Sequence, residues 1–127
     1  MNIPDNLKYT KDHLWLRKEG EIVVCGITDY AQNELGDVVF VELPQVGTQI
    51  RVGDRMGDIE SIKTVSNLYA PVSGEIREVN QELEKKPELI NQSPYEEGWI
   101  CKIKPANEAD FDSLWGSKDY QEFIEKS

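Results

Sequence analysis

Glycine and proline interrupt the middle of the chain so often that neither a long helix nor a long strand fits there. Between residues 44 and 79 the interruptions are Pro44, Gly47, Gly53, Gly57, Pro71 and Gly74. Glycine permits tight turns, and proline cannot donate a hydrogen bond to a sheet ladder. The intervening segments are short and recur about every eight to twelve residues. The pattern predicts a mostly β fold, either a small sandwich or a flattened barrel of short antiparallel strands.

Further strands are predicted outside this region, at residues 14–17, 21–27, 37–43 and 99–103. In residues 37–43 we expect Val39, Val41 and Leu43 to share one face, because side chains alternate along a strand. Residues 46–50 and 72–76 look like two copies of one turn-and-strand unit, placed on either side of Lys63.

Helices are predicted in two places. A short helix near residues 29–35 has Asp29 as its N-cap, Gln32 as the partner in a capping box, and Gly36 as its end. Residues 108–115 and 118–126 predict two C-terminal helices, the first stopping at Gly116 and the second capped by Ser117. Their aromatic residues, including Tyr120 and Phe123, have the spacing of side chains that pack a helix on a sheet. Residues 80–91 are predicted as loop with one helical turn near Leu83.

The length of 127 residues predicts one domain, 1–127, with a C-terminal helical segment at about 107–126. No apolar run is long enough to span a bilayer, and residues 1–11 lack the apolar centre of a signal peptide. We therefore expect a monomer with no membrane partner. The expected location is the cytoplasm, or the mitochondrial matrix if a presequence has been removed.

The formal net charge of −10 argues against a nucleic-acid partner, because no basic stripe is present to displace counterions from phosphates. A negative field suits brief docking on the basic rims of partner enzymes. Solubility alone explains many of these charges equally well.

The residues that could act as nucleophiles or metal ligands are few. Cys25 and Cys101 are the two cysteines, and both lie in apolar runs, so we expect buried, reduced thiols rather than a disulfide framework or a metal site. His13 is the single histidine, and nothing pairs it with either thiol. A stand-alone hydrolase is therefore disfavoured.

Lys63 lies between two strand-like runs, residues 56–62 and 64–69, and Ala70-Pro71 ends the second run. A lysine at a hairpin tip would be exposed, mobile and free to react, as a covalently loaded carrier arm requires. Ile62 and Thr64 are β-branched and disfavour positive φ, so the turn must differ from the common two-residue types. On local grounds alone, Lys63 is an ordinary surface lysine.

The wider sequence resembles one family. The segment Glu60-Ser61-Ile62-Lys63-Thr64, followed by 70–74 (Ala-Pro-Val-Ser-Gly), resembles the lipoylation segment of the glycine cleavage system H-protein family. That family usually has Glu-Ser-Val-Lys-Ala, then Pro-(Ile/Val/Leu)-Ser-Gly. Other similar blocks occur in the same order at 9–15, 26–32, 35–39, 87–91 and 94–99. Together they cover nearly the whole chain.

The resemblance implies a lipoyl-domain-like fold with a quasi-twofold repeat and lipoic acid attached covalently to Lys63. A lipoate ligase or lipoyl transferase would read the folded hairpin, because a protonated lysine needs an activated acyl donor. The expected recognition and hairpin residues are Glu60, Ser61, Ile62, Thr64 and Gly74.

The resemblance also implies a function, in which lipoyl-Lys63 shuttles the aminomethyl group of glycine. The donor would be the pyridoxal-phosphate-dependent glycine decarboxylase, and the acceptor the tetrahydrofolate-dependent aminomethyltransferase. Dihydrolipoyl dehydrogenase would reoxidise the arm. Such a chain is a carrier and is not an enzyme by itself.

Two positions depart from the family pattern. Leu14 and Asn67 stand where the family commonly has acidic residues near the parked arm, so an arm pocket is expected at His13, Leu14 and Asn67. These departures suggest an alternative, an H-like lipoyl carrier serving another pathway such as lipoyl relay or sulfur-compound oxidation. A biotin carrier fits less well, because Ile62 and Thr64 are not the methionines of that motif. The remaining alternative is an interaction module that carries no cofactor.

Overall fold

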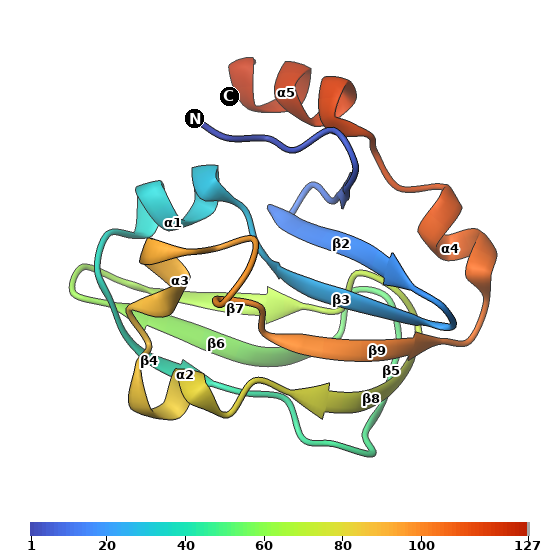
Figure 1. Ribbon diagram of the computed structural model, residues 1–127, viewed down its shortest axis with the longest axis horizontal. Coiled ribbons are helices and arrows are strands. Elements are labelled where there is room, and N and C mark those ends of the chain that lie inside the picture. Colours follow the sequence, from blue (N-terminus) through green and yellow to red (C-terminus); the bar gives the residue numbers. More distant parts are fainter. Residues whose placement is uncertain (127) are drawn as a thin grey trace.

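Two antiparallel sheets pack against each other around one apolar core (Figure 1). The computed structural model describes residues 1–126. The larger sheet has the order β1 (Lys8–Tyr9), β2 (Leu14–Glu19), β3 (Ile22–Ile27), β9 (Cys101–Pro105), β8 (Gly74–Val79) and β5 (Gln49–Ile50). The smaller has the order β4 (Val38–Glu42), β6 (Arg55–Ser61) and β7 (Val65–Tyr69). The predicted mostly β sandwich is confirmed.

The helices cover two ends of this sandwich. Helices α1 (Asp29–Leu35), α2 (Glu82–Lys85) and α3 (Leu89–Gln92) lie at the same end as the turn between β6 and β7 (Figure 1). Helices α4 (Glu108–Asp112) and α5 (Ser117–Glu125) follow β9, and α5 returns to the N-terminal segment. Within residues 1–126, no helix is long and apolar enough to cross a membrane.

Two apolar clusters hold the layers together. The main core joins Ile59 and Leu68 of the smaller sheet to Leu16, Ile76 and Ile103 of the larger one. Each such fully buried aliphatic side chain contributes about 1.5–3 kcal/mol. The second cluster lies under α5, where the rings of Tyr9 and Tyr120 stack with centroids 4.7 Å apart. The prediction that the aromatics of the last helix pack on the sheet is confirmed.

The two similar segments, 46–50 and 72–76, lie side by side. Strands β5 and β8 pair antiparallel, with Gln49 opposite Glu75 and Ile50 opposite Gly74. The Gly47 amide also donates to the Ile76 carbonyl at 2.8 Å. An antiparallel pair has a local twofold axis, so the expected quasi-twofold relation between these units follows from this pairing.

The start of α1 differs from the prediction. Thr28, and not Asp29, is the N-cap, because its extended backbone lets the hydroxyl accept from the Ala31 amide at 3.2 Å. Asp29 is the first helical residue, and its carboxylate accepts a hydrogen bond from the Gln32 side chain at 2.7 Å. The predicted end at Gly36 is confirmed, with φ at 79°.

The predicted face of residues 37–43 is wrong. Val41 is 3% exposed, as expected, but Val39 is 50% exposed. The register between β4 and β6 shifts between Val38 and Phe40, which indicates a β-bulge. A bulge adds one residue to a strand, so it reverses the alternation of side chains.

Residues 80–92 contain more helix than predicted. The turn at Leu83 is confirmed as α2, and a second helix, α3, was missed. Neither helix has a side-chain N-cap, so the sequence offers no start signal. Leu83 and Ile90 are fully buried, and both side chains belong to the main core.

The first C-terminal helix ends earlier than predicted. It stops at Asp112 rather than at 115, because the Trp115 backbone pairs with Tyr9 in both directions at 2.8 and 3.1 Å. Gly116, and not Ser117, is the N-cap of α5. The Ser117 hydroxyl instead donates to the Asp5 carboxylate at 2.7 Å.

A Cβ at Gly74 would collide with the carbonyl oxygen of Lys104 on β9. We expect Gly74→Ala to lower the free energy of unfolding by about 2–4 kcal/mol, because backbone must move to admit the methyl group. Urea unfolding measures this change. Gly116→Ala is the control, because nothing lies within 4 Å of its added methyl, and we expect a loss of about 1 kcal/mol or less there. Equal losses in the two variants would refute this account of Gly74.

Candidate functional site

Lys63 lies at the tip of the hairpin that joins β6 to β7, and this confirms the predicted hairpin. Its side chain is exposed, and it makes no hydrogen bond or ion pair to any residue from 1 to 126. The lysine is therefore available for chemistry, while the two strands that carry it are anchored in the core by Ile59 and Leu68.

The Ser61 side chain builds the turn. Its hydroxyl accepts hydrogen bonds from the backbone amides of Lys63 and Thr64, each at 3.2 Å, and donates to the Thr64 carbonyl at 3.3 Å. One donor and two acceptor sites are all that a hydroxyl has. The turn needs no positive φ, because His13 is the one non-glycine residue among 1–126 with that conformation. The prediction of an uncommon turn type is thereby confirmed.

Gly36 forms the surface on which the lysine stem rests. A Cβ on Gly36 would lie 2.9 Å from Cε of Lys63, so a side chain there would displace the lysine. The adjacent Asp37 carbonyl accepts from the Ile62 amide at 3.0 Å. The end of α1 therefore supports the hairpin directly.

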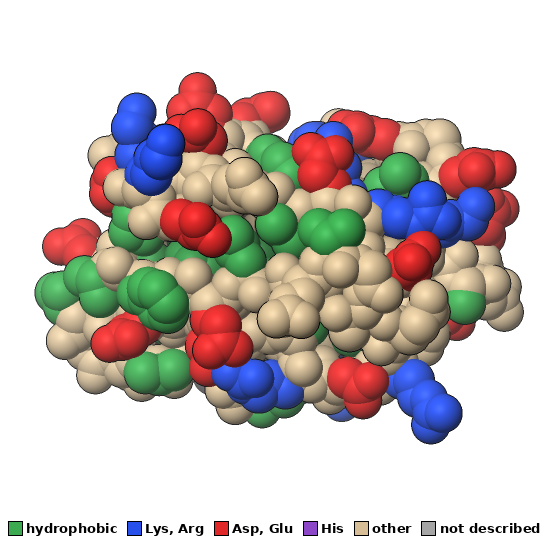
Figure 2. Space-filling model, turned by 90° about the horizontal axis from the view of Figure 1, so that it is seen from below, with side chains coloured by type: hydrophobic (Ala, Val, Ile, Leu, Met, Phe, Trp, Pro, Cys, Tyr) green, Lys and Arg blue, Asp and Glu red, His purple; other side chains and the backbone are tan. Residues whose placement is uncertain are grey.

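Exposed apolar side chains surround the hairpin. Phe40 and Val65 flank Glu60 across the three strands of the smaller sheet, and Ile62 at the tip is 69% exposed. Figure 2 shows hydrophobic side chains exposed among acidic ones at this end of the molecule, on its left. Several large apolar side chains exposed close together suit a surface that contacts a partner. Glu60 and Thr64 lie within it and are both exposed.

Gly74 does not belong to the hairpin, contrary to the expectation. It is the first residue of β8 in the larger sheet, between Ile50 of β5 and Pro105 of β9. Its close approach to Lys104 explains why glycine is required there. Gly74 follows Lys63 closely in the sequence, but Gly74 lies in the larger sheet and Lys63 in the hairpin of the smaller one, so the two residues do not share a site.

A cavity of about 400 Å³ lies beside the hairpin, and we call it the hairpin cavity. It is bounded by the start of β2, by α1, by Thr64 of the turn and by residues 65–68 of β7. His13, Leu14 and Asn67 all line it, so the structure brings together the three residues expected at an arm pocket. Its apolar lining comprises Leu14, Ile27, Tyr30, Ala31, Leu35, Ile59, Val65 and Leu68.

His13 is fixed at the edge of this cavity. Its Nδ1 lies 2.9 Å from the Tyr120 hydroxyl, which in turn lies 2.7 Å from the Thr28 hydroxyl. Burial lowers the pKa of His13, and the negative charges of Asp12 and Glu34 oppose that shift. The imidazole is therefore neutral at pH 7 and adds no positive charge to the cavity.

The structure explains the two departures at Leu14 and Asn67. Leu14 is 2% exposed and belongs to the main core, so its side chain adds apolar packing. Asn67 lies opposite Asp58 on β6, and its amide donates to the Tyr69 hydroxyl at 3.0 Å. An acid at position 67 would face Asp58, and like charges directly opposite each other destabilise a sheet.

Sequence reasoning missed several residues around the site. Asn91 bonds to Gly36 and Val38 beneath the hairpin, Tyr120 bonds to His13, and Glu34 lines the cavity. Asn91 and Tyr120 come from distant parts of the chain and carry no local signal. Glu34 could have been found, because it lies two residues before Gly36 on the helix that ends at the hairpin.

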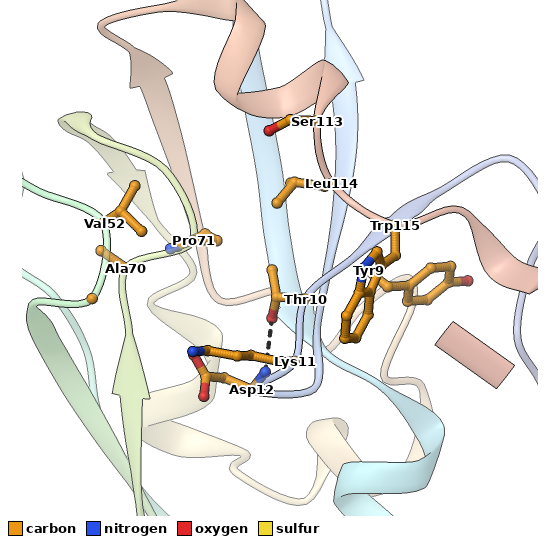
Figure 3. A pocket seen from close by; sticks show the side chains of 11 residues that line it. Tyr9, Thr10, Lys11, Asp12, Val52, Ala70, Pro71, Ser113, Leu114 and Trp115 are labelled. Carbon is orange, nitrogen blue, oxygen red and sulfur yellow. Dashed lines mark hydrogen bonds between the residues drawn. The ribbon is translucent and has the colours of Figure 1, made fainter. Parts of the chain in front are cut away.

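A second cavity, of about 470 Å³, lies at the opposite end of β7 from Lys63 (Figure 3). Val52, Pro71 and Leu114 form apolar walls, and Lys11 and Asp12 lie together at one edge (Figure 3). Nothing in the sequence predicted this cavity. Within residues 1–126, no group of His, Cys, Asp and Glu side chains is arranged to hold a metal ion.

Replacement of Ser61 tests how the hairpin is held. Ser61→Ala leaves the Lys63 and Thr64 amides without their side-chain acceptor, and we expect a loss of about 0.5–1.5 kcal/mol in urea unfolding. Amide exchange at these two positions should also become faster. Ser66→Ala is the matched control on β7, since the Ser66 hydroxyl bonds to no residue within 1–126. Unchanged exchange at Lys63 in Ser61→Ala would contradict this role.

The comparisons with known proteins agree with one another. The profile of the family described as Glycine cleavage H-protein matches residues 7–127. The glycine cleavage system H proteins of Staphylococcus haemolyticus and Staphylococcus saprophyticus are each 52% identical to this chain over 124 residues, 98% of either chain. The crystal structure of a glycine cleavage system H protein from Mycobacterium marinum matches with a TM-score of 0.89 and 38% identity, over 97% of this chain and 99% of that one. The chain belongs to the glycine cleavage H-protein family.

Proposed function

We propose that this chain is the lipoyl carrier of a glycine cleavage system and that Lys63 is its attachment residue. In this role it takes the aminomethyl group of glycine from the pyridoxal-phosphate-dependent decarboxylase to the tetrahydrofolate-dependent aminomethyltransferase. The observation that carries the proposal is one exposed lysine, in the family's segment 60–64, at the tip of a hairpin anchored in the core.

The surroundings of Lys63 fit a lipoyl group. When attached, that group supplies a disulfide that can accept and release the aminomethyl cargo. The hairpin cavity adjoins residues 64–68 and has mostly aliphatic walls, which suit a hydrocarbon arm. Ser61 holds the turn, Gly36 leaves room for the lysine stem, and the aliphatic side chains of the cavity can contact the hydrocarbon part of the arm. These residues position and shelter the arm, while catalysis belongs to the partners.

The partners follow from the same role. A lipoate ligase or lipoyl transferase would acylate Lys63, and dihydrolipoyl dehydrogenase would reoxidise the arm. The exposed apolar residues around the hairpin and the net charge of −10 suit brief docking on basic-rimmed enzyme surfaces. We propose a monomer in the cytoplasm, since the relatives reported above come from bacteria.

A lipoyl carrier of another pathway is the less favoured alternative. Its basis was the absence of acids at Leu14 and Asn67, and both residues have a structural explanation in this chain. The relatives that match nearly its full length are named for glycine cleavage.

Glycine–bicarbonate exchange, with lipoylated protein and an active glycine decarboxylase, tests the proposal. We expect exchange with the wild type and none above background with Lys63→Arg, which keeps the charge but cannot be lipoylated. Lys85→Arg, at an exposed position of α2, is the matched control and should retain full exchange. Mass spectrometry verifies one lipoyl group per chain. The proposal is wrong if lipoylated wild-type protein gives no exchange, or if exchange persists without Lys63.

A further inference from the structure

The charges around the hairpin cavity are of one sign. Asp12 and Glu34 are the acidic side chains among its lining residues, and no lysine or arginine lines it. His13 adds no positive charge, for the reason given above. The cavity therefore combines aliphatic walls with negative charge at its edge. A ligand that suits both features has an apolar chain ending in a cationic group.

Acylation of Lys63 would remove one positive charge from this end of the molecule. The Lys63 ammonium is the cation that lies against Gly36, next to α1. Amide formation removes this positive charge from the end of α1. A positive group on the arm would be drawn to the same place.

Of the two carboxylates, Glu34 is the better placed. It lies on α1, between Tyr30 and Leu35, which also line the cavity. Its side chain is exposed, and it forms no hydrogen bond or ion pair within residues 1–126. Asp12 follows Lys11 directly in the sequence, whereas no basic residue is next to Glu34 in the sequence.

We propose that Glu34 is the residue that binds the amine of the aminomethyl cargo when the arm lies in the hairpin cavity. This inference rests on the proposed function. It assigns the contact with the cargo amine to helix α1, and the same helix ends at Gly36, which supports the lysine stem. Glu34 thereby supplies at the cavity the negative charge that neither Leu14 nor Asn67 provides.

The test uses full-length lipoylated protein, loaded with the decarboxylase and glycine and then separated from that enzyme. The first readout is the rate at which the loaded protein releases ammonia in buffer. We expect Glu34→Gln to release it about 1.4- to fivefold faster than wild type, which is the range for an exposed ion pair. Glu84→Gln, at an exposed position of α2, makes the same charge change away from the cavity and should match wild type.

A second readout separates binding of the amine from a structural role. Loading should shift the NMR amide signals of Ala31 and Leu35 in wild type, and this shift should shrink in Glu34→Gln. The oxidised, unloaded forms of the two proteins should give the same signals at Ala31 and Leu35. High salt should reduce the difference in release rate, since the contact is between opposite charges.

The outcomes are distinct. Equal release rates for wild type and Glu34→Gln would overturn the role of Glu34 and leave the proposed function intact. An equal acceleration in Glu84→Gln would also overturn it, because the effect would then come from net charge. Lipoylated wild-type protein that takes up no aminomethyl group would overturn the proposed function and this inference together.

Discussion

The side chain of Asn91 holds the segment on which the Lys63 hairpin rests. Its amide nitrogen donates to the Gly36 carbonyl at 2.8 Å and to the Gln32 side chain at 3.1 Å, and its oxygen accepts from the Val38 amide at 2.9 Å. Both amide hydrogens and one acceptor site are therefore used. The clamped segment contacts the Lys63 stem at Gly36 and the Ile62 amide at Asp37. One residue of a four-residue helix thus fixes where the lysine leaves the surface.

The C-terminal helix is part of the same construction. Tyr120 is fully buried, and its hydroxyl meets both Thr28, the N-cap of α1, and His13, at the edge of the hairpin cavity. Burial raises the pKa of Tyr120, so the phenol stays protonated and can donate to one of these partners while accepting from the other. Two walls of the cavity are therefore tied to one side chain of α5. Buried polar groups that satisfy one another in this way fix relative positions more strictly than apolar contacts do.

The sequence predicted the features that local residues determine. Lys63, its hairpin, and the end of α1 at Gly36 follow from segments of a few residues with clear turn and stop signals. The fold class followed from the spacing of glycine and proline. The bulge that exposes Val39, the early end of α4, and the location of Gly74 could not be read in this way. Each depends on which strand or segment lies opposite, and the order of residues does not specify that partner. The same holds for Asn67, whose surroundings are set by Asp58 across the sheet.

The burial of the two cysteines matters for the disulfide chemistry proposed for Lys63. Cys25 and Cys101 face each other across β3 and β9 with their sulfurs 3.2 Å apart, and both are buried. The hydrogen bond to Cys25, together with burial, raises the pKa of the Cys101 thiol well above its ordinary value. Thiol–disulfide exchange requires an accessible thiolate, but both thiols are buried, and the raised pKa of Cys101 keeps that thiol protonated. A protein that carries a disulfide on a swinging arm must not contain a thiol able to attack it. Because both thiols are buried in the core, neither would attack the disulfide of a lipoyl arm attached to Lys63 as proposed.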